Sequence, residues 1–189
     1  SLAAQVRSRL FLAHVRASTG TATSRNNCHP FTVGKWSFMH NGQVGGFEKF
    51  RKRADMLIPD ALYACRKGAT DSEVLFLLML GQLEANPAGG PVQALAAAVR
   101  QLQDLSQTHG EPPHMRLSAA FSDGDTLWAA RYSSDEIAPT VYYRWSETRG
   151  GWAVVSEPLE ADETGWCALE PGQVARFRGD RVEKMAFRP

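Results

Sequence analysis

Two polar segments near the start of the chain contain the residues best suited to chemistry. They read "FLAHVRASTGTATSRNNCHPF" at residues 11–31 and "WSFMHNGQVGG" at residues 36–46. Arg16 follows an apolar run of strand length, where its guanidinium can bind a carboxylate through two parallel hydrogen bonds. The plain alternative is a surface arginine at the end of a strand, and the position alone does not separate the two.

The pair Asn41 and Gly42 ends a second apolar run. Asn-Gly is a strong hairpin-turn signal, so a simple turn is the plain interpretation. The functional interpretation is an oxyanion hole, because an asparagine side-chain amide and a glycine backbone N–H can point at one developing negative charge. Glycine also lets the backbone approach a reacting group closely.

Asp71 stands at the start of the apolar segment "TDSEVLFLLMLGQLEA". A carboxylate there can simply offset the dipole of a helix. It can also bind the ammonium group of a substrate. Taken with the arginine and the oxyanion pair, it completes a site for an α-amino acid whose side chain carries a reactive carbonyl. Glutamine or a γ-glutamyl compound would match.

The strands and loops around these groups can be predicted from the pattern. Residues 9–17 form an apolar run of strand length and are interpreted as a buried strand, and residues 36–42 as a second strand. The basic stretch that follows, to Gly68, is interpreted as irregular. Its "KFRKR" cluster at residues 49–53 reads as a solvated loop or a helix end.

The middle of the chain predicts two helices, and the remainder predicts a strand meander. Thr70 can cap a helix over residues 70–85, with Glu73 three residues on, and Pro91 suits the first turn of an amphipathic helix. Three hairpins follow, around "DGD", "ETRGG" and Gly179-Asp180. This order indicates an α+β fold with helices packed on antiparallel sheet.

The composition is that of one soluble domain with a single core. The chain has 189 residues, 43% of them hydrophobic and 22% charged, with a net charge of +1. The scattered basic residues argue against nucleic-acid binding, and no apolar run is long enough to span a membrane. Three cysteines without CxxC spacing argue against a disulfide framework and a zinc site, so we expect a cytoplasmic protein without metal or cofactor.

The motifs "AHVRAST", "NCHPF", "FMHNG" and "TDSE" resemble, in order and spacing, the signatures of class II glutamine amidotransferases, which are N-terminal-nucleophile hydrolases. Residues 154–177 also resemble the region where these proteins complete their second sheet. The closest similarity is to small stand-alone members, including the amidohydrolase of ergothioneine biosynthesis that removes a γ-glutamyl group. The resemblance implies a four-layer αββα sandwich of two face-to-face antiparallel sheets with helices outside.

The resemblance also implies a role for each matching residue. Arg16 would bind the α-carboxylate of the substrate, and Thr19 would line the same pocket. Asn41 and Gly42 would form the oxyanion hole, and Asp71 would bind the α-ammonium group. These roles coincide with those inferred from the residue types.

The histidines and cysteines are expected to play supporting parts. His29 would be either a support for the pocket or a satisfied loop histidine. His40 should face the opposite side of its strand from Asn41, as a hydrogen-bonded core residue. Cys28, Cys65 and Cys167 are interpreted as small buried or partly exposed residues.

The family's nucleophile is an N-terminal cysteine whose own amino group acts as base. The chain has fifteen residues before Arg16, none of them cysteine. Ser1 leads into a helix-like segment, and Cys28 is internal and has no free amine, so neither is favoured as a replacement. We therefore expect residues 1–189 to be a single glutamine amidotransferase type 2 domain that is incomplete at its N-terminus and lacks the strands there. On this view the fragment alone is inactive.

Three functions follow from these expectations. The first is an enzyme that hydrolyses glutamine or a γ-glutamyl amide through a cysteinyl thioester, with the missing N-terminal segment and a small-molecule substrate as its partners. The second is a non-catalytic module that binds glutamine or a γ-glutamyl ligand on the same fold. The third is a structural or interaction protein.

Overall fold

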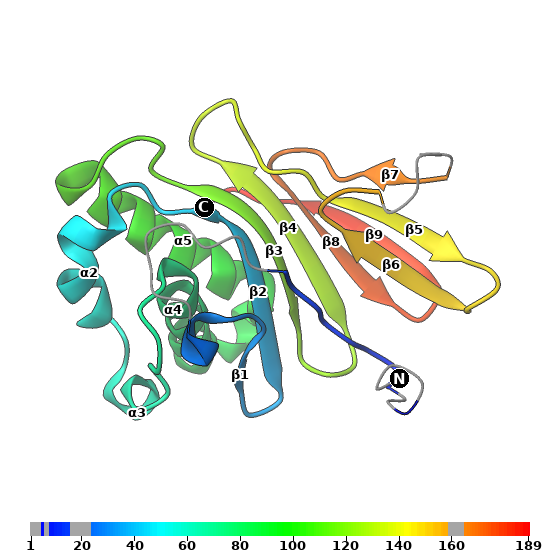
Figure 1. Cartoon of the computed structure of the whole chain (residues 1–189), viewed down its shortest axis with the longest axis horizontal. Helices are drawn as coiled ribbons and strands as arrows, with labels where there is room; N and C mark the ends of the chain where they lie inside the picture. Colours follow the sequence, from blue (N-terminus) through cyan, green and yellow to red (C-terminus); the bar gives the residue numbers. More distant parts are fainter. Residues whose placement is uncertain (1–4, 6–7, 16–23, 159–164) are drawn as a thin grey trace.

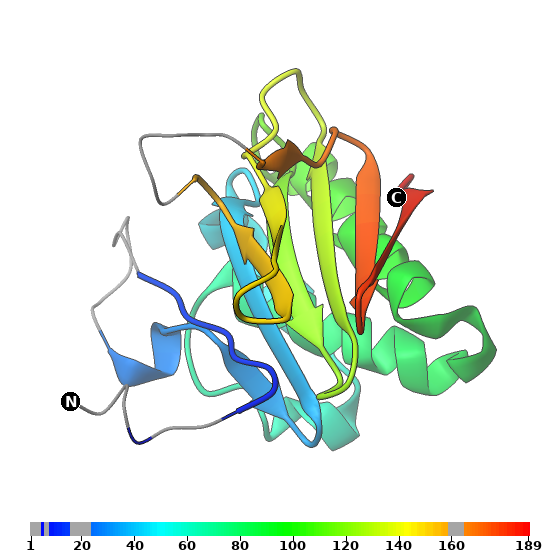
Figure 2. The same cartoon turned by 90° about the vertical axis from the view of Figure 1, so that its right-hand side faces the viewer.

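The computed structural model describes residue 5 and residues 8–15, 24–158 and 165–189. In this part of the chain a layer of helices, a large sheet and a small sheet follow one another across the view, with the helices at the left and the small sheet at the right (Figure 1). The large sheet is the middle layer, so its strands are covered by helices on one face and by the small sheet on part of the other. Figure 2 shows the small sheet in front of the central strands.

Both sheets are antiparallel throughout. The large sheet has the strand order β1-β2-β3-β4-β8-β9 and the small sheet the order β6-β5-β7. The strands of the large sheet are β1 (Phe31–Val33), β2 (Trp36–Gln43), β3 (Arg116–Ser122), β4 (Leu127–Ser133), β8 (Gln173–Arg178) and β9 (Arg181–Ala186). The strands of the small sheet are β5 (Tyr142–Ser146), β6 (Gly151–Val155) and β7 (Cys167–Ala168). The three predicted hairpins are all present.

The helices are α2 (Phe47–Asp55), α3 (Asp60–Tyr63), α4 (Asp71–Ala85) and α5 (Gly90–His109), with short 3-10 turns η1 (Arg25–Asn27) and η2 (Pro87–Gly89). The two helices that the sequence predicts are α4 and α5. Thr70 caps α4 as predicted, because its Oγ1 accepts a hydrogen bond of 3.2 Å from the Glu73 N–H. Pro91 stands in the first turn of α5, where its missing N–H costs nothing.

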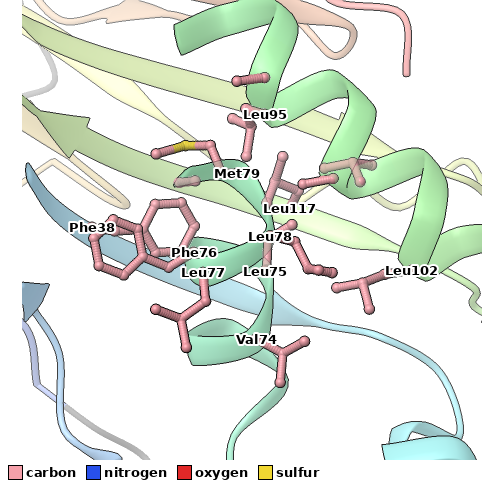
Figure 3. Close-up of a cluster of buried hydrophobic side chains, with 14 of the residues drawn as sticks. Phe38, Val74, Leu75, Phe76, Leu77, Leu78, Met79, Leu95, Leu102 and Leu117 are labelled. Atoms are coloured by element: carbon pink, nitrogen blue, oxygen red, sulfur yellow. The ribbon is translucent and has the colours of Figure 1, made fainter. Parts of the chain in front are cut away.

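The main core lies between the helices and the large sheet. Every residue of α4 from Ser72 to Leu80 is buried, as expected of a helix that is covered on all sides by α5 and the sheet. Phe76 stacks on Phe38 of β2 with ring centroids 5.4 Å apart, while Leu95 and Leu102 approach from α5 (Figure 3). A second, smaller cluster lies between the two sheets; it contains Ala129, Val141, Tyr143, Leu169, Ala175 and Phe177.

These layers confirm the α+β class with antiparallel sheets packed face to face. The described residues supply three layers of the expected four-layer sandwich, since no helix among them covers the outer face of the small sheet. No helix in the described ranges is long and apolar enough to cross a membrane.

Two local predictions are wrong. Residues 10–15 have no regular structure, and Phe11 and Val15 are 75% and 96% exposed, so the described part of the predicted strand at 9–17 is neither paired nor buried. The stretch interpreted as irregular contains α2 and α3. Phe47, Phe50 and Ala54 recur at helical spacing and are buried, which gives this basic segment an apolar helix face.

Candidate functional site

A cavity of about 1040 Å³ opens beside the end of β2 and the start of α4. Its floor is the face of the large sheet that carries Ser118, Ala120 and Ala129. These side chains are small and leave room above this face of the sheet. Val154 and Val155 of β6 border the cavity from the small sheet. The cavity therefore extends between the two sheets.

The side chains at the end of β2 alternate between the two faces of the sheet, and both Asn41 and His40 border the cavity. Asn41 borders the cavity and is exposed, and it pairs in register with Ser118. His40 is 3% exposed and turns toward α4, as the alternation of a strand requires. The strand continues past Asn41 and Gly42 to Gln43. The hairpin-turn interpretation of this Asn-Gly pair is therefore wrong.

Gly42 occupies a position that no other residue fits. Its φ is 149°, and a Cβ added there would lie 1.9 Å from the Arg116 carbonyl oxygen and 2.7 Å from His40 Nε2. A side chain would require the backbone of β3 to move. The glycine thus lets β2 and β3 approach closely at the edge of the cavity.

Asp71 borders the same cavity from the N-terminus of α4. Its Oδ2 accepts a hydrogen bond of 2.9 Å from the Val44 N–H, and its Oδ1 accepts one of 2.7 Å from the Ser72 N–H. The helix dipole and these N–H groups stabilise the charged carboxylate. An ionised carboxylate has about four acceptor positions, so capacity remains for a cation in the cavity.

His40 is a hydrogen-bonded core residue, as predicted. Its Nδ1 lies 3.0 Å from Ser72 Oγ, and its Nε2 lies 3.0 Å from the Arg116 carbonyl oxygen. The Arg116 guanidinium is in turn hydrogen-bonded to Asp135, with Nη2 and Oδ2 2.7 Å apart. That contact raises the pKa of Arg116 and, with a hydrogen bond from Ser133, holds the pKa of Asp135 well below its usual range.

The loop that leads into α4 is held by two buried side chains that the sequence did not single out. Glu73 is 3% exposed, and its oxygens accept hydrogen bonds of 2.8 Å from the N–H groups of Lys67 and Gly68. Asn27 is 4% exposed, and its Oδ1 accepts one of 2.8 Å from the Ala69 N–H. The spacing of Glu73 from the helix cap does not predict this role, in which its carboxylate stabilises the preceding loop.

Two of the predicted binding residues, Arg16 and Thr19, lie outside the described residues. The adjoining residues Ala13, His14 and Val15 border the cavity. His29 borders it as well, and its ring packs 4.4 Å from the His14 ring, centroid to centroid. The structure therefore brings Asn41, Gly42 and Asp71 together, and the first polar segment reaches the same cavity through His14 and His29.

None of the three cysteines borders the cavity. Cys28 is exposed, with Sγ 3.3 Å from the Ser24 carbonyl oxygen, and Cys167 is exposed on β7. Cys65 is partly buried against the main core. No group of three or more histidine, cysteine or acidic side chains within the described ranges is placed to hold a metal ion.

The arrangement offers an amide donor, a close backbone approach and a carboxylate around one cavity. A family model described as glutamine amidotransferases class-II matches residues 2–188. The chain belongs to this family. The fold, with its antiparallel sheets packed face to face, is thus that of a class II glutamine amidotransferase domain.

Two proteins are similar to the chain over most of its length. The chain is 30% identical to the probable glutamine amidotransferase DUG3 of Saccharomyces cerevisiae over 96% of its own length, and it spans 60% of the length of that protein. A glutamine aminotransferase class-II domain protein from Silicibacter pomeroyi has a solved structure that is 60% identical. It superposes with a TM-score of 0.81 over 88% of this chain and 74% of that one.

More distant solved structures share the fold alone. The glutamine phosphoribosylpyrophosphate amidotransferase of B. subtilis is 16% identical and superposes with a TM-score of 0.59. The match covers 92% of this chain and 34% of that one. The arrangement of helices and two antiparallel sheets is therefore shared with this amidotransferase at low sequence identity.

Proposed function

We propose that the complete protein hydrolyses the γ-amide of glutamine or of a γ-glutamyl compound through a cysteinyl thioester. The observation that carries the proposal is that Asn41, Gly42 and Asp71 border one cavity although they come from two separate elements. An oxyanion pair and an ammonium-binding carboxylate around one space fit an amino acid that reacts at its side-chain carbonyl.

The proposed reaction begins with attack of a cysteine thiolate on the γ-carbonyl carbon. The carbonyl oxygen becomes an oxyanion, which accepts hydrogen bonds from the Asn41 side-chain amide and the Gly42 N–H. The C–N bond then breaks, and ammonia or an amine leaves with a proton delivered by the amino group of the nucleophile. Water attacks the resulting thioester, releases the γ-carboxylate and restores the thiol.

The other residues would hold the unreactive end of the substrate. Asp71 would bind the α-ammonium group, while Arg16 would bind the α-carboxylate and Thr19 would line that part of the pocket. Because Cys28, Cys65 and Cys167 lie away from the cavity, we place the nucleophile upstream of Ser1 and expect residues 1–189 alone to be inactive. Glutamine hydrolysis by these residues in isolation would contradict this placement.

The motifs of the first polar segment also resemble those of the stand-alone amidohydrolase of ergothioneine biosynthesis. A cytoplasmic hydrolase that releases a γ-glutamyl group from an amide is therefore the specific form of the proposal. γ-Glutamyl amides and free glutamine should be compared as substrates, with release of glutamate as the common readout.

The decisive variant is Asn41→Ala in the complete protein. Removing one oxyanion donor should lower kcat by roughly 10²–10³-fold. Asn86→Ala is the control, since Asn86 is an exposed asparagine at the other end of α4. A loss of less than tenfold for Asn41→Ala would contradict the assignment. Glutamine binding without turnover by the unmodified complete protein would instead support a non-catalytic binding module.

A second variant, Asp71→Asn, tests the ammonium site. The amide keeps one acceptor oxygen but loses the charge that would attract an ammonium group. We expect the KM for glutamine to rise about tenfold or more, as for the loss of a charge-assisted hydrogen bond of roughly 1.5–3 kcal/mol. Steady-state kinetics at saturating glutamine separates this from an effect on kcat. An unchanged KM would remove Asp71 from the binding site.

A further inference from the structure

A closed circuit of contacts joins the end of β2 to the start of α4. His40 Nδ1 lies 3.0 Å from Ser72 Oγ, and the Ser72 N–H donates to Asp71 Oδ1 at 2.7 Å. Asp71 Oδ2 accepts from the Val44 N–H at 2.9 Å. The backbone from Val44 back to His40 closes the circuit. Residues 41–43, which include the oxyanion pair, are therefore fastened to α4 at both ends.

The hydrogen-bond partners assign the protons of His40. Nε2 faces the Arg116 carbonyl oxygen, which can only accept, so Nε2 carries a proton. In the neutral ring Nδ1 is then an acceptor, and the Ser72 hydroxyl donates to it. Ser72 Oγ also lies 3.2 Å from Asp71 Oδ1, but one hydroxyl proton serves one acceptor at a time. The Ser72 N–H holds the carboxylate in either case.

The circuit is buried and packs against the glycine of the oxyanion pair. His40 is 3% exposed and Ser72 is 6% exposed, so their hydrogen bonds are shielded from competing water. A Cβ at Gly42 would lie 2.7 Å from His40 Nε2. The imidazole therefore lies directly beneath the backbone whose N–H is assigned to the oxyanion.

We propose that His40 and Ser72 are positioning residues that fix the separation between the oxyanion pair and the Asp71 carboxylate. The inference rests on the proposed function, because it concerns a substrate held at its α-ammonium group and attacked at its γ-carbonyl. For such a substrate a displacement of about 1 Å between the two points can cost on the order of 100-fold in rate. Both residues border the cavity, but the role assigned to them acts through Asp71 and the backbone of residues 41–43 and not through contact with the substrate.

Two substrates of the complete protein test this role. Glutamine has both the α-ammonium group and the γ-amide, whereas glutaramate has the γ-amide but no ammonium group. Ser72→Ala removes the link to His40 and leaves the backbone N–H that holds Asp71. We expect kcat/KM for glutamine to fall about tenfold or more, as for a misplaced reacting group. The value for glutaramate should change by less than about threefold, because that substrate is not held at both points.

The ratio of the two kcat/KM values is the readout that a merely structural role would not move. Ser122→Ala is the matched control, since Ser122 is 1% exposed and bonds the Gly124 N–H at the far end of β3. It should lower stability without changing the ratio. Equal losses for both substrates in Ser72→Ala, or no loss for either, would overturn the proposal.

Two conservative variants of His40 separate the two sides of its ring. His40→Asn keeps a polar atom near Nδ1, within reach of Ser72, while His40→Gln keeps one near Nε2, within reach of the Arg116 carbonyl. The proposal requires the preference for glutamine over glutaramate to survive in His40→Asn and to decline in His40→Gln. The reverse order would overturn it.

Failure of the proposed function can be told apart from failure of the positioning role. If the complete protein turned over neither substrate, the assigned reaction would be wrong. Calorimetric Kd values for glutamine and glutaramate would then test the circuit directly, since Ser72→Ala should weaken the preference for glutamine. An unchanged preference, or binding of neither ligand, would overturn the positioning role.

Discussion

Replacing the buried Glu73 with glutamine should destabilise the protein by about 3 kcal/mol, as for one partner removed from a buried ion pair. The Glu73 and Arg66 side chains are only 4% and 6% exposed, and Arg66 Nη1 lies 2.5 Å from Glu73 Oε2. The same carboxylate accepts the Lys67 and Gly68 N–H groups at 2.8 Å. A glutamine NH₂ group would face at least one of these donors and leave it without an acceptor.

The size of the expected loss of stability depends on the ion pair that Arg66 retains in the variant. Removing one partner of a buried pair costs about 3–5 kcal/mol when the other charge is left uncompensated. Arg66 Nε also lies 3.0 Å from Asp55 Oδ1, and the Asp55 side chain is 21% exposed. This second carboxylate still compensates the guanidinium in the variant, which places the expected loss at the low end of the range.

Urea unfolding followed by tryptophan fluorescence measures the loss. With an m-value of about 2 kcal/mol/M, the midpoint of Glu73→Gln should fall by about 1.5 M. Glu48→Gln is the control, because Glu48 lies on the exposed face of α2 and its Oε2 is 3.8 Å from Arg51 Nη1. An exposed pair of this kind should contribute less than about 0.5 kcal/mol. A loss below about 1 kcal/mol for Glu73→Gln would refute the reasoning, since the pair would then behave like an exposed one.

Two further variants, one of them with a matched control, test the close approach of β2 and β3 and the Arg116–Asp135 ion pair. Gly42→Ala should lower the free energy of unfolding in urea by about 3 kcal/mol or more. The new Cβ would clash with the Arg116 carbonyl, and the φ of residue 42 is unfavourable for alanine. Gly34→Ala, with φ of 57° and open space around it, should cost only about 1–2 kcal/mol, and equal losses would contradict the steric explanation. Asp135→Asn should be less stable than the unmodified protein at neutral pH, because the folded state lowers the pKa of Asp135 and so favours its charged form. This stability is present above the ordinary aspartate pKa of about 3.9 and is lost as the pH falls through the lower folded value, so the difference in urea midpoint should narrow below about pH 4. A difference in urea midpoint that stays constant as the pH falls below about 4 would contradict the lowered pKa of Asp135.

Much of the fold could be predicted because local signals agreed with tertiary structure. The helix over residues 70–85 has a threonine cap and an unbroken apolar segment, and the structure gives α4 at Asp71–Ala85. The hairpin at "DGD" has strands of matching length on each side. In such segments the residues that favour the local structure are also those that the core buries, so the pattern is reliable.

The errors arose where burial depends on distant segments. The apolar run at residues 9–17 has the composition of a strand, yet Phe11 and Val15 are exposed and no described strand pairs with that segment. Asn41 and Gly42 have the identity of a turn, but pairing with β3 carries the strand through them. Whether a segment forms a strand depends on pairing with another segment, and the local sequence does not show which segment that is.

The candidate site shows the same division. The residue types alone suggest that Asn41, Gly42 and Asp71 bind the same substrate, and all three border one cavity. The supporting contacts of Glu73 and Asn27 could not be foreseen. Asn27 joins a 3-10 turn to a loop residue 42 positions along the chain, and Glu73 bonds the loop five and six residues before it. No spacing rule predicts such contacts.

The two hydrophobic clusters of the fold are separate, and the cavity lies where the smaller one ends. Segments that pack in separate clusters can unfold locally with different free energies. Strands β5 and β6 pack in the smaller cluster. A ligand held between β2 and the end of β6 would therefore contact both clusters and couple their opening. Amide hydrogen exchange in β5 and β6 should slow when the site is occupied, while exchange in α4 should hardly change. The exchange protection of the small sheet would then report whether the site is occupied.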